Sequence, residues 1–361
     1  MGADEVMSVK DGLERVCDNH PEERAGRTDI LPELDRRKFL GKAGTIAAGL
    51  GALYIATAVP GCGKKPGATA TAEEGPTAAP EEIPAPAQAT PPPPGLVVAR
   101  GTDPARTLRA GLAAWGGLHT LNLSGKKVLI KVNAAFARAP DQATTTDPGL
   151  VAEAVRICLE AGASRVTVFD HILQDLVDQT LERNGIGPAA RAAGAEVVAY
   201  AVNKPGPARV VRIPGATALP SAGILEEVFQ ADAILDMPKS KHHSGARLSM
   251  AMKNFIGITQ NMGSFHNVDL HRAIAEIHTV VKPSLVISDA TSILLDNGPG
   301  GPGTVARPGQ VIIGTDPVAV DSYTCGLFGV SPASIAHIVY GEQLGVGTTD
   351  FNSLGLKEVS A

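Results

Sequence analysis

The fold class can be predicted from the stretch VLIKVNAAFARAPDQATTTDPGLVAEAVRICLEAGASRVTVFD, residues 128–170. This stretch opens with a short apolar run at 128–132, which is typical of a buried strand. Asp147-Pro148 then indicates a helix start, because Asp is a favoured N-cap and Pro is tolerated in the first turn. A second apolar run follows at 166–169. The order strand, helix, strand predicts the repeating unit of a parallel sheet.

The same alternation continues along the chain. We expect a helix near 176–193, strands near 196–200, 233–237, 285–290 and 311–315, and a helix beginning at Asp316-Pro317. The strand runs are continuously apolar, as in a sheet covered on both faces. The pattern predicts a three-layer α/β sandwich with a mainly parallel sheet over residues 96–355. The Pro- and Gly-rich segment 202–225 is expected to leave the sheet as a hairpin.

Composition restricts the class of protein. The chain has 361 residues, 44% of them apolar, and a formal net charge of −5. This balance argues against a nucleic-acid partner, which needs a broad basic surface. The four cysteines, at positions 17, 62, 158 and 325, do not form a zinc or ferredoxin motif, so we expect no iron–sulfur cluster in this chain.

The N-terminal region has the features of an export address. Arg36 and Arg37 precede Phe39-Leu40, and a Gly- and Ala-rich, weakly apolar run follows at 43–61. This arrangement resembles a twin-arginine export signal. It predicts the twin-arginine translocase as a partner and an extracytoplasmic location. A single transmembrane anchor is the alternative interpretation of the same run.

Cys62 follows Gly61 directly after that run, as in a lipoprotein cleavage site. Lipidation at Cys62 would anchor the protein to a membrane, and an inert cysteine is the alternative. Residues 63–95 are rich in Pro, Ala, Thr and Glu, a composition that predicts a disordered linker. The expected organisation is a signal with a lipidation site at 1–62, a linker at 63–95 and an α/β domain at 96–355.

Polar residues gather where the predicted strands end, which is where open α/β sheets bind ligands. They are Lys131, Asn133, Asp170, His171, Asp236, Lys239, Lys241, Asp289 and Asp316. Each has a simple structural explanation as well. Asp147 and Asp316 can act as N-caps, Asp170 and Asp289 can cap turns, and Lys131 can reach the surface from a sheet edge. Their shared position predicts that some of them line one cleft.

The segment DMPKSKHHSGARLSMAMKNFIG, residues 236–257, carries four cations and one carboxylate in a mildly acidic chain. A net charge of +3 at a strand end suits a small anion such as a carboxylate or a phosphate compound. Lys253-Asn254 lies on a short predicted helix at 249–258 that is otherwise apolar, so the ammonium needs a partner or a ligand. A solvated basic loop is the alternative interpretation. The glycine-rich run 297–303 is expected to be a turn or a lid.

His243 and His266 flank Lys253 along the chain, and neutral imidazoles are good ligands for transition metals. The candidate catalytic residues are Lys253, His243, His266 and Asp289. The candidate anion ligands are Lys131, Asn133, Lys239, Lys241 and Asn254, and the candidate metal ligands are His243 and His266. Two hypotheses stay open. One is a metal- or cofactor-dependent enzyme, an isomerase or oxidoreductase, acting on a small anionic substrate. The other is a non-catalytic binding or assembly factor for an anion or an extracytoplasmic redox partner.

Several motifs together resemble the family called domain of unknown function 362. They are Lys131-Val132-Asn133 with Thr146-Asp147-Pro148, the segment 238–242 with 253–257, Ser288-Asp289-Ala290, Gly298-Pro299 and the run 314–321. The resemblance covers residues 96 to 345 and implies little about function. Some members carry iron–sulfur segments, and this chain lacks the cysteines for them.

A second similarity is to the lactate racemase family, which uses a nickel-pincer nucleotide. That family has a His, a Lys ten positions later and a further His, and His243, Lys253 and His266 follow this order here. The resemblance implies that these residues hold a metal and a cofactor and move protons.

Overall fold

The computed structural model describes residues 95–173 and 176–361. The predicted export signal with Arg36 and Arg37, the candidate lipidation site Cys62 and the linker up to residue 94 all lie outside the described residues. In the described ranges, no helix is both long and apolar enough to cross a membrane.

One large sheet forms the centre of the domain, with the strand order β13-β1-β12-β10-β7-β2-β3-β4. These strands are β1 (Leu96–Arg100), β2 (Lys127–Val132), β3 (Arg165–Ile172), β4 (Glu196–Ala201), β7 (Ala233–Met237), β10 (Leu285–Leu294), β12 (Gln310–Gly314) and β13 (Lys357–Ser360). The five strands from β10 to β4 run parallel to one another, and β12 is antiparallel to both of its neighbours. The prediction of a mainly parallel α/β sheet is therefore confirmed.

Shorter strands extend this sheet beyond the end of β7. They are β8 (Lys239–His243), β9 (Arg247–Ser249) and β11 (Val305–Ala306). β8 pairs in parallel with β10 and antiparallel with β9, so the part of the basic segment 236–257 that carries Lys239 and Lys241 is a strand of the sheet. Separately, β5 (Ala208–Arg212) and β6 (Ser221–Leu225) pair as the hairpin predicted for 202–225.

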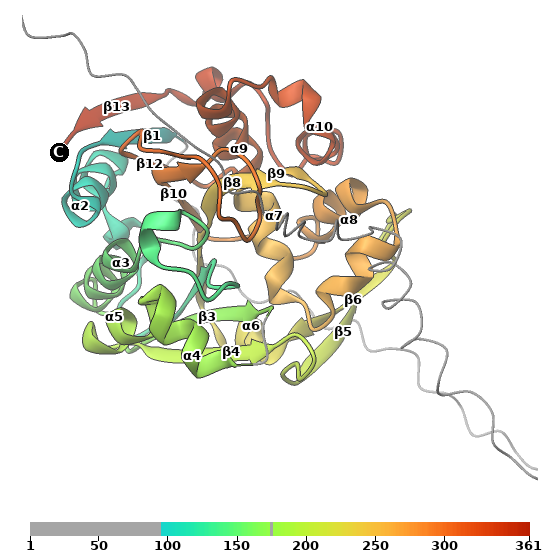
Figure 1. The fold of residues 1–361 in the computed structure, drawn as a ribbon, viewed down its shortest axis with the longest axis horizontal. Coiled ribbons are helices and arrows are strands. Elements are labelled where there is room, and N and C mark those ends of the chain that lie inside the picture. Colours follow the sequence, from blue (N-terminus) through green and yellow to red (C-terminus); the bar gives the residue numbers. More distant parts are fainter. Residues whose placement is uncertain (1–94, 174–175) are drawn as a thin grey trace, which may run out of the picture. The chain divides into compact units, whose positions relative to one another are not determined.

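Helices cover both faces of the sheet (Figure 1). They are α2 (Pro104–Trp115), α3 (Pro148–Glu160), α4 (Val177–Asn184), α5 (Ile186–Ala192), α6 (Glu226–Gln230), α7 (Ala251–Phe255), α8 (Leu270–Ile277), α9 (Pro317–Cys325) and α10 (Ala336–Gln343). Side chains alternate along each strand. Val128 and Ile130 of β2 therefore pack in one core with α2 to α5, whereas Leu129 packs in the other core with α7 and α8.

Helix boundaries follow local signals, with two corrections. Asp147 and Asp316 accept hydrogen bonds from Leu150 N and Ala319 N, so both are the expected N-caps. The single helix predicted at 176–193 is wrong. Gly185 adopts a φ of 76°, which ends α4 and starts α5 in a new direction.

The helix predicted at 249–258 is also shorter than expected. Ser249 still belongs to β9, α7 covers only Ala251–Phe255, and a 3-10 turn follows at Ile256–Ile258. At the C-terminus, β13 lies past residue 355, where the domain was expected to end, and pairs in parallel with β1.

Candidate functional site: a lysine-rich cavity

A cavity of about 210 Å³ lies beyond the carboxyl ends of β2 and β3, where ligands bind in open α/β sheets. Strand ends form one part of its wall, and α7 with the turn after it forms another. Further parts of the wall come from Met262, Gly263, His266 and Pro299. Its volume corresponds to about seven water molecules, at about 30 Å³ each, so it suits a small metabolite.

Seven of the nine predicted site residues line this cavity, although they come from distant parts of the chain. They are Lys131, Asn133, Lys241, His243, Lys253, Asn254 and His266. Lys239 and Asp289 do not line it. Arg247, the remaining cation of the basic segment, donates instead to the carbonyl of Ser334 at 2.7 Å.

Lys131 forms an ion pair with a buried carboxylate. Its Nζ lies 2.6 Å from Asp170 Oδ1, and both side chains are buried. Asp170 also accepts hydrogen bonds from the backbone N–H groups of Ala134 and His171. Gly257 lies directly against this pair, because a Cβ there would be 2.6 Å from Lys131 Cε and 2.9 Å from its Nζ. A larger residue at this position would therefore have to displace the end of the Lys131 side chain from the ion pair.

Lys239 is also paired, but away from the cavity. Its Nζ donates to Asp289 Oδ2 at 2.9 Å, and the same oxygen accepts from Asp147 N at 2.7 Å. The other oxygen of Asp289 accepts from the backbone and the hydroxyl of Thr291. These contacts tie β8, β10 and the start of α3 together. They favour the turn-capping interpretation of Asp289 over the predicted catalytic one.

Lys241 is buried without a carboxylate partner. Its Nζ donates to Asn133 Oδ1 at 3.0 Å and to the carbonyl of Thr144, and it lies 4.9 Å from the centroid of the Phe136 ring. Burial is the main cause that lowers the pKa of Lys241, to about 7, with Lys253 and the other lysines acting in the same direction. The side chain is thus held in place by neutral groups, and Asp170, the carboxylate that favours its charged form, is already paired with Lys131.

Lys253 has fewer contacts still. It is 9% exposed on α7 and makes no hydrogen bond or ion pair with any residue that the structure describes. Burial, and then the charge of Lys131, lower the pKa of Lys253 to about 8. Asp236 does not neutralise it, because Asp236 Oδ1 accepts from Asn254 Nδ2 at 2.7 Å and burial raises the pKa of this carboxyl well above its ordinary value.

His243 does not fit the predicted metal site. Its Nδ1 accepts hydrogen bonds from Gly245 N at 3.0 Å and Ala246 N at 3.1 Å. The neutral ring therefore carries its proton on Nε2, which leaves no lone pair there for a metal. His266 stacks on His243 with 6.4 Å between ring centroids, and the described ranges contain no group of three potential metal ligands. Nε2–H of His243 is instead a hydrogen-bond donor.

From the sequence, His171 was identified only as one of several polar residues at the ends of predicted strands. It lines the cavity and is 1% exposed. Its Nδ1–H donates to the carbonyl of Gly257 at 3.0 Å, so Nε2 carries a lone pair, and this atom has no partner among the described residues. Burial lowers the pKa of His171. The only sequence signal was its place after Asp170 at the end of a predicted strand.

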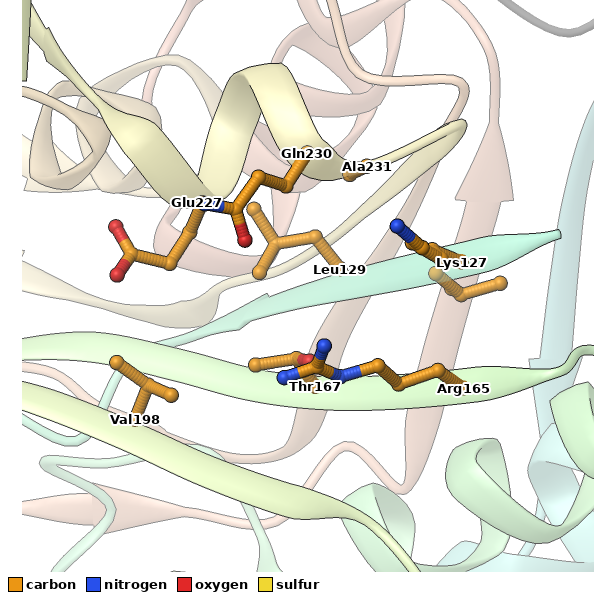
Figure 2. A pocket seen from close by; sticks show the side chains of 9 residues that line it. Lys127, Leu129, Arg165, Thr167, Val198, Glu227, Gln230 and Ala231 are labelled. Carbon is orange, nitrogen blue, oxygen red and sulfur yellow. The ribbon is translucent and has the colours of Figure 1, made fainter.

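A second hollow of about 90 Å³ lies at the opposite ends of the strands. Figure 2 shows Lys127 and Arg165 at the starts of β2 and β3, with Glu227 on α6. Arg165 is paired with Glu196, and Glu227 accepts a hydrogen bond from Tyr200 OH. Lys127 and Arg165 are exposed, so this hollow does not hold the buried lysines that distinguish the lysine-rich cavity.

The model of the family described as Domain of unknown function (DUF362) matches residues 128–326, more than half of the chain. The chain belongs to this family. The matched range of the DUF362 domain includes every residue named above that lines the cavity. A relative named as a thylakoid-associated protein of Synechocystis is 23% identical over 253 residues, which cover 67% of this chain and 75% of the relative.

Proposed function

We propose that the cavity binds a small organic anion, with Lys241 and Lys253 as its main charged ligands. One observation carries the proposal: two buried lysines face one cavity without a carboxylate partner. Burying an uncompensated ammonium is costly, and an anionic ligand would remove that cost. Nε2–H of His243 adds a neutral donor in the same wall.

We further propose that the protein acts on this ligand as an enzyme. Support comes from Lys241 and Lys253, whose pKa values burial lowers to about 7 and about 8 in the wall of the same cavity. Groups that can accept and donate protons at neutral pH, held together in one cavity, are the equipment of general acid–base catalysis. The residues around His243 do not fit a nickel or other metal centre, so no metal enters the proposal.

The location of the protein is a separate proposal that comes from the sequence. Arg36-Arg37 and Cys62 support export followed by attachment to a membrane, with the linker joining the anchor to the domain. The Synechocystis relative is named for its association with thylakoids, which agrees with a position beside a membrane.

Ligand binding can be tested by calorimetry and by thermal unfolding with lactate, malonate, succinate and inorganic phosphate. Lys253→Met keeps the apolar stem and removes the charge. We expect the variant to fold at least as stably as wild type at neutral pH and to lose about 1.5–3 kcal/mol of affinity for the best anion. Lys357→Met, at an exposed lysine on β13, is the matched control and should bind as wild type does. Equal anion affinity in wild type and Lys253→Met would overturn the assignment.

A further inference from the structure

The three lysines that line the cavity are held very differently. Lys131 is fixed by Asp170 and by the carbonyl of Val132, which lies 2.6 Å from its Nζ. Lys241 is fixed by Asn133 and the carbonyl of Thr144. Among the residues that the structure describes, Lys253 alone of these three has no group that holds its Nζ. An ammonium whose task is only to hold an anion is best fixed by neutral acceptors, as Lys241 is.

The surroundings of Lys253 favour the neutral amine. The side chain is buried on a helix between Met252 and Asn254, and no described carboxylate pairs with it. The charges of neighbouring lysines add to the effect of burial. With a pKa of about 8, roughly one Lys253 side chain in ten is a free amine at pH 7, against about one in several thousand for an ordinary exposed lysine. A desolvated lysine beside another cation is a known way of making an amine nucleophilic.

We propose that Lys253 forms an imine with the carbonyl carbon of a small oxo-carboxylate bound in this cavity. This inference rests on the proposed function, because the carboxylate of the ligand would lie against Lys241, which keeps its fixed position. It narrows the substrate class from any small anion to one that carries a ketone or aldehyde group. The apolar side of the cavity, with Phe136 and Ile256, suits the carbon chain of such a ligand.

The reaction is balanced by the groups present. The amine nitrogen of Lys253 attacks the carbonyl carbon, and a proton moves from nitrogen to oxygen to give a carbinolamine. The C–O bond then breaks and the oxygen leaves as water, which leaves a C=N bond to Nζ. Water from the solvent can accept the proton from nitrogen and return it to the departing oxygen. Nothing is oxidised or reduced in these steps.

The test is reductive trapping. The full-length protein is incubated with pyruvate, 2-oxobutyrate, 2-oxoglutarate or acetoacetate in the presence of sodium cyanoborohydride, which reduces an imine to a stable secondary amine. Peptide mass mapping then locates the adduct. We expect the adduct at Lys253 to form more than ~10-fold faster than at any other lysine, because the free-amine fraction is so much larger there. Lys253→Arg should abolish it, and Lys357→Arg should leave it unchanged.

A parallel binding experiment separates the two proposals. Lactate and malonate carry carboxylates but have no ketone or aldehyde group, so they can test anion binding without imine formation. If they bind in a manner that depends on Lys253 and Lys241 but none of the four oxo acids gives an adduct at Lys253, the imine is wrong and the anion site stands. If they do not bind and the oxo acids label surface lysines equally in wild type and Lys253→Arg, both proposals fail. An adduct confined to Lys253 supports both.

Discussion

At the scale of single residues, the pairing of four buried lysines is uneven. Lys131 and Lys239 each have a carboxylate, whereas Lys241 and Lys253 do not. Folding lowers the pKa of Lys241 to about 7 and of Lys253 to about 8, and an unfolded lysine titrates near ~10.4. Between these values the unfolded chain binds more protons than the folded one. The stability of the protein should therefore rise with pH in this window.

The predicted rise in stability with pH can be tested for Lys253 alone. Below its folded pKa the buried ammonium destabilises the fold fully, and the penalty fades as the pH approaches the unfolded value. The difference in unfolding free energy between wild type and Lys253→Met should shift by about 2 kcal/mol in favour of wild type from pH 7 to pH 10, at about 1.4 kcal/mol per pH unit for one proton. Urea unfolding at both pH values measures it, with Lys357→Met as the control. A difference that does not change with pH would show that Lys253 is solvated.

Gly257 is predicted to be essential for the geometry of the Lys131–Asp170 pair. In Gly257→Ala the new methyl group would meet Lys131 Cε, and neither partner of the buried pair can move away without losing the other. We expect a loss of about 1–3 kcal/mol in unfolding free energy, together with weaker anion binding. Gly326→Ala is the control, because a Cβ there has open space around it. Unchanged stability and binding in Gly257→Ala would contradict the close packing of this turn on the pair.

Much of the site's membership could be predicted from sequence, because the carboxyl ends of parallel strands meet at one edge of a sheet. The hydrogen-bond and ion-pair partners of the individual lysines could not be predicted from the sequence. Which lysine is neutralised depends on contacts such as Lys131 with Asp170 and Lys241 with the carbonyl of Thr144, 39 and 97 residues apart along the chain. The tautomers of His243 and His171 depend on backbone groups that no motif identifies. Metal ligation by His243 was therefore a reasonable prediction that the local hydrogen bonds do not support.

At the scale of elements, α7 presents Lys253 and Asn254, and Asp321 of α9 holds this helix in place. Both oxygens of Asp321 accept hydrogen bonds from the first turn of α7, from Ala251 N at 2.7 Å and from Met252 N at 3.0 Å. Asp321 is fully buried. A carboxylate on one helix thus fixes the helix that lines the cavity.

Asp321→Ala should leave these two N–H groups unpaired and destabilise the protein by about 2–4 kcal/mol, while also weakening anion binding. Asp103→Ala is the matched control, since Asp103 caps α2 by accepting from Arg106 N, away from the cavity. Asp103→Ala should lower the free energy of unfolding by about 1 kcal/mol and leave anion binding unchanged. Chemical unfolding and calorimetry on the same samples give both quantities. If Asp321→Ala binds anions as well as Asp103→Ala does, Asp321 has no role in positioning α7.

The elements themselves were largely predictable, because strong local signals mark them. Asp-Pro pairs begin α3 and α9, and Pro- and Gly-rich flanks enclose the hairpin of β5 and β6. The errors arose where tertiary contacts override the pattern. Gly185 divides an apparently continuous helix, and β8 is a strand although its sequence, KSKHH, is polar. Lys239 and Lys241 are accommodated in this strand because Asp289 and Asn133 accept hydrogen bonds from their Nζ atoms.

At the scale of the whole molecule, the sequence predicts an exported domain tethered to a membrane. Replacing Arg36 and Arg37 with Lys should retain the protein in the cytoplasm, and Cys62→Ala should abolish incorporation of labelled lipid without blocking export. Cell fractionation and metabolic lipid labelling measure these outcomes, and Cys158→Ala is the control for the second. Normal export of the double Lys variant would exclude a twin-arginine signal.

Proton uptake on ligand binding tests whether an anion contacts Lys241 and Lys253. A bound anion that has no ketone or aldehyde group, such as lactate or malonate, stabilises the charged form of both lysines and raises their pKa, so at pH 8 the protein should take up protons as such a ligand binds. Calorimetry of lactate or malonate binding at pH 8, in buffers with different ionisation enthalpies, gives the number of protons directly. We predict an uptake of about half a proton or more in wild type, clearly less in Lys253→Met, and affinity that falls about tenfold or more from pH 7 to pH 9. Binding with no proton uptake, and with affinity independent of pH, would contradict the account.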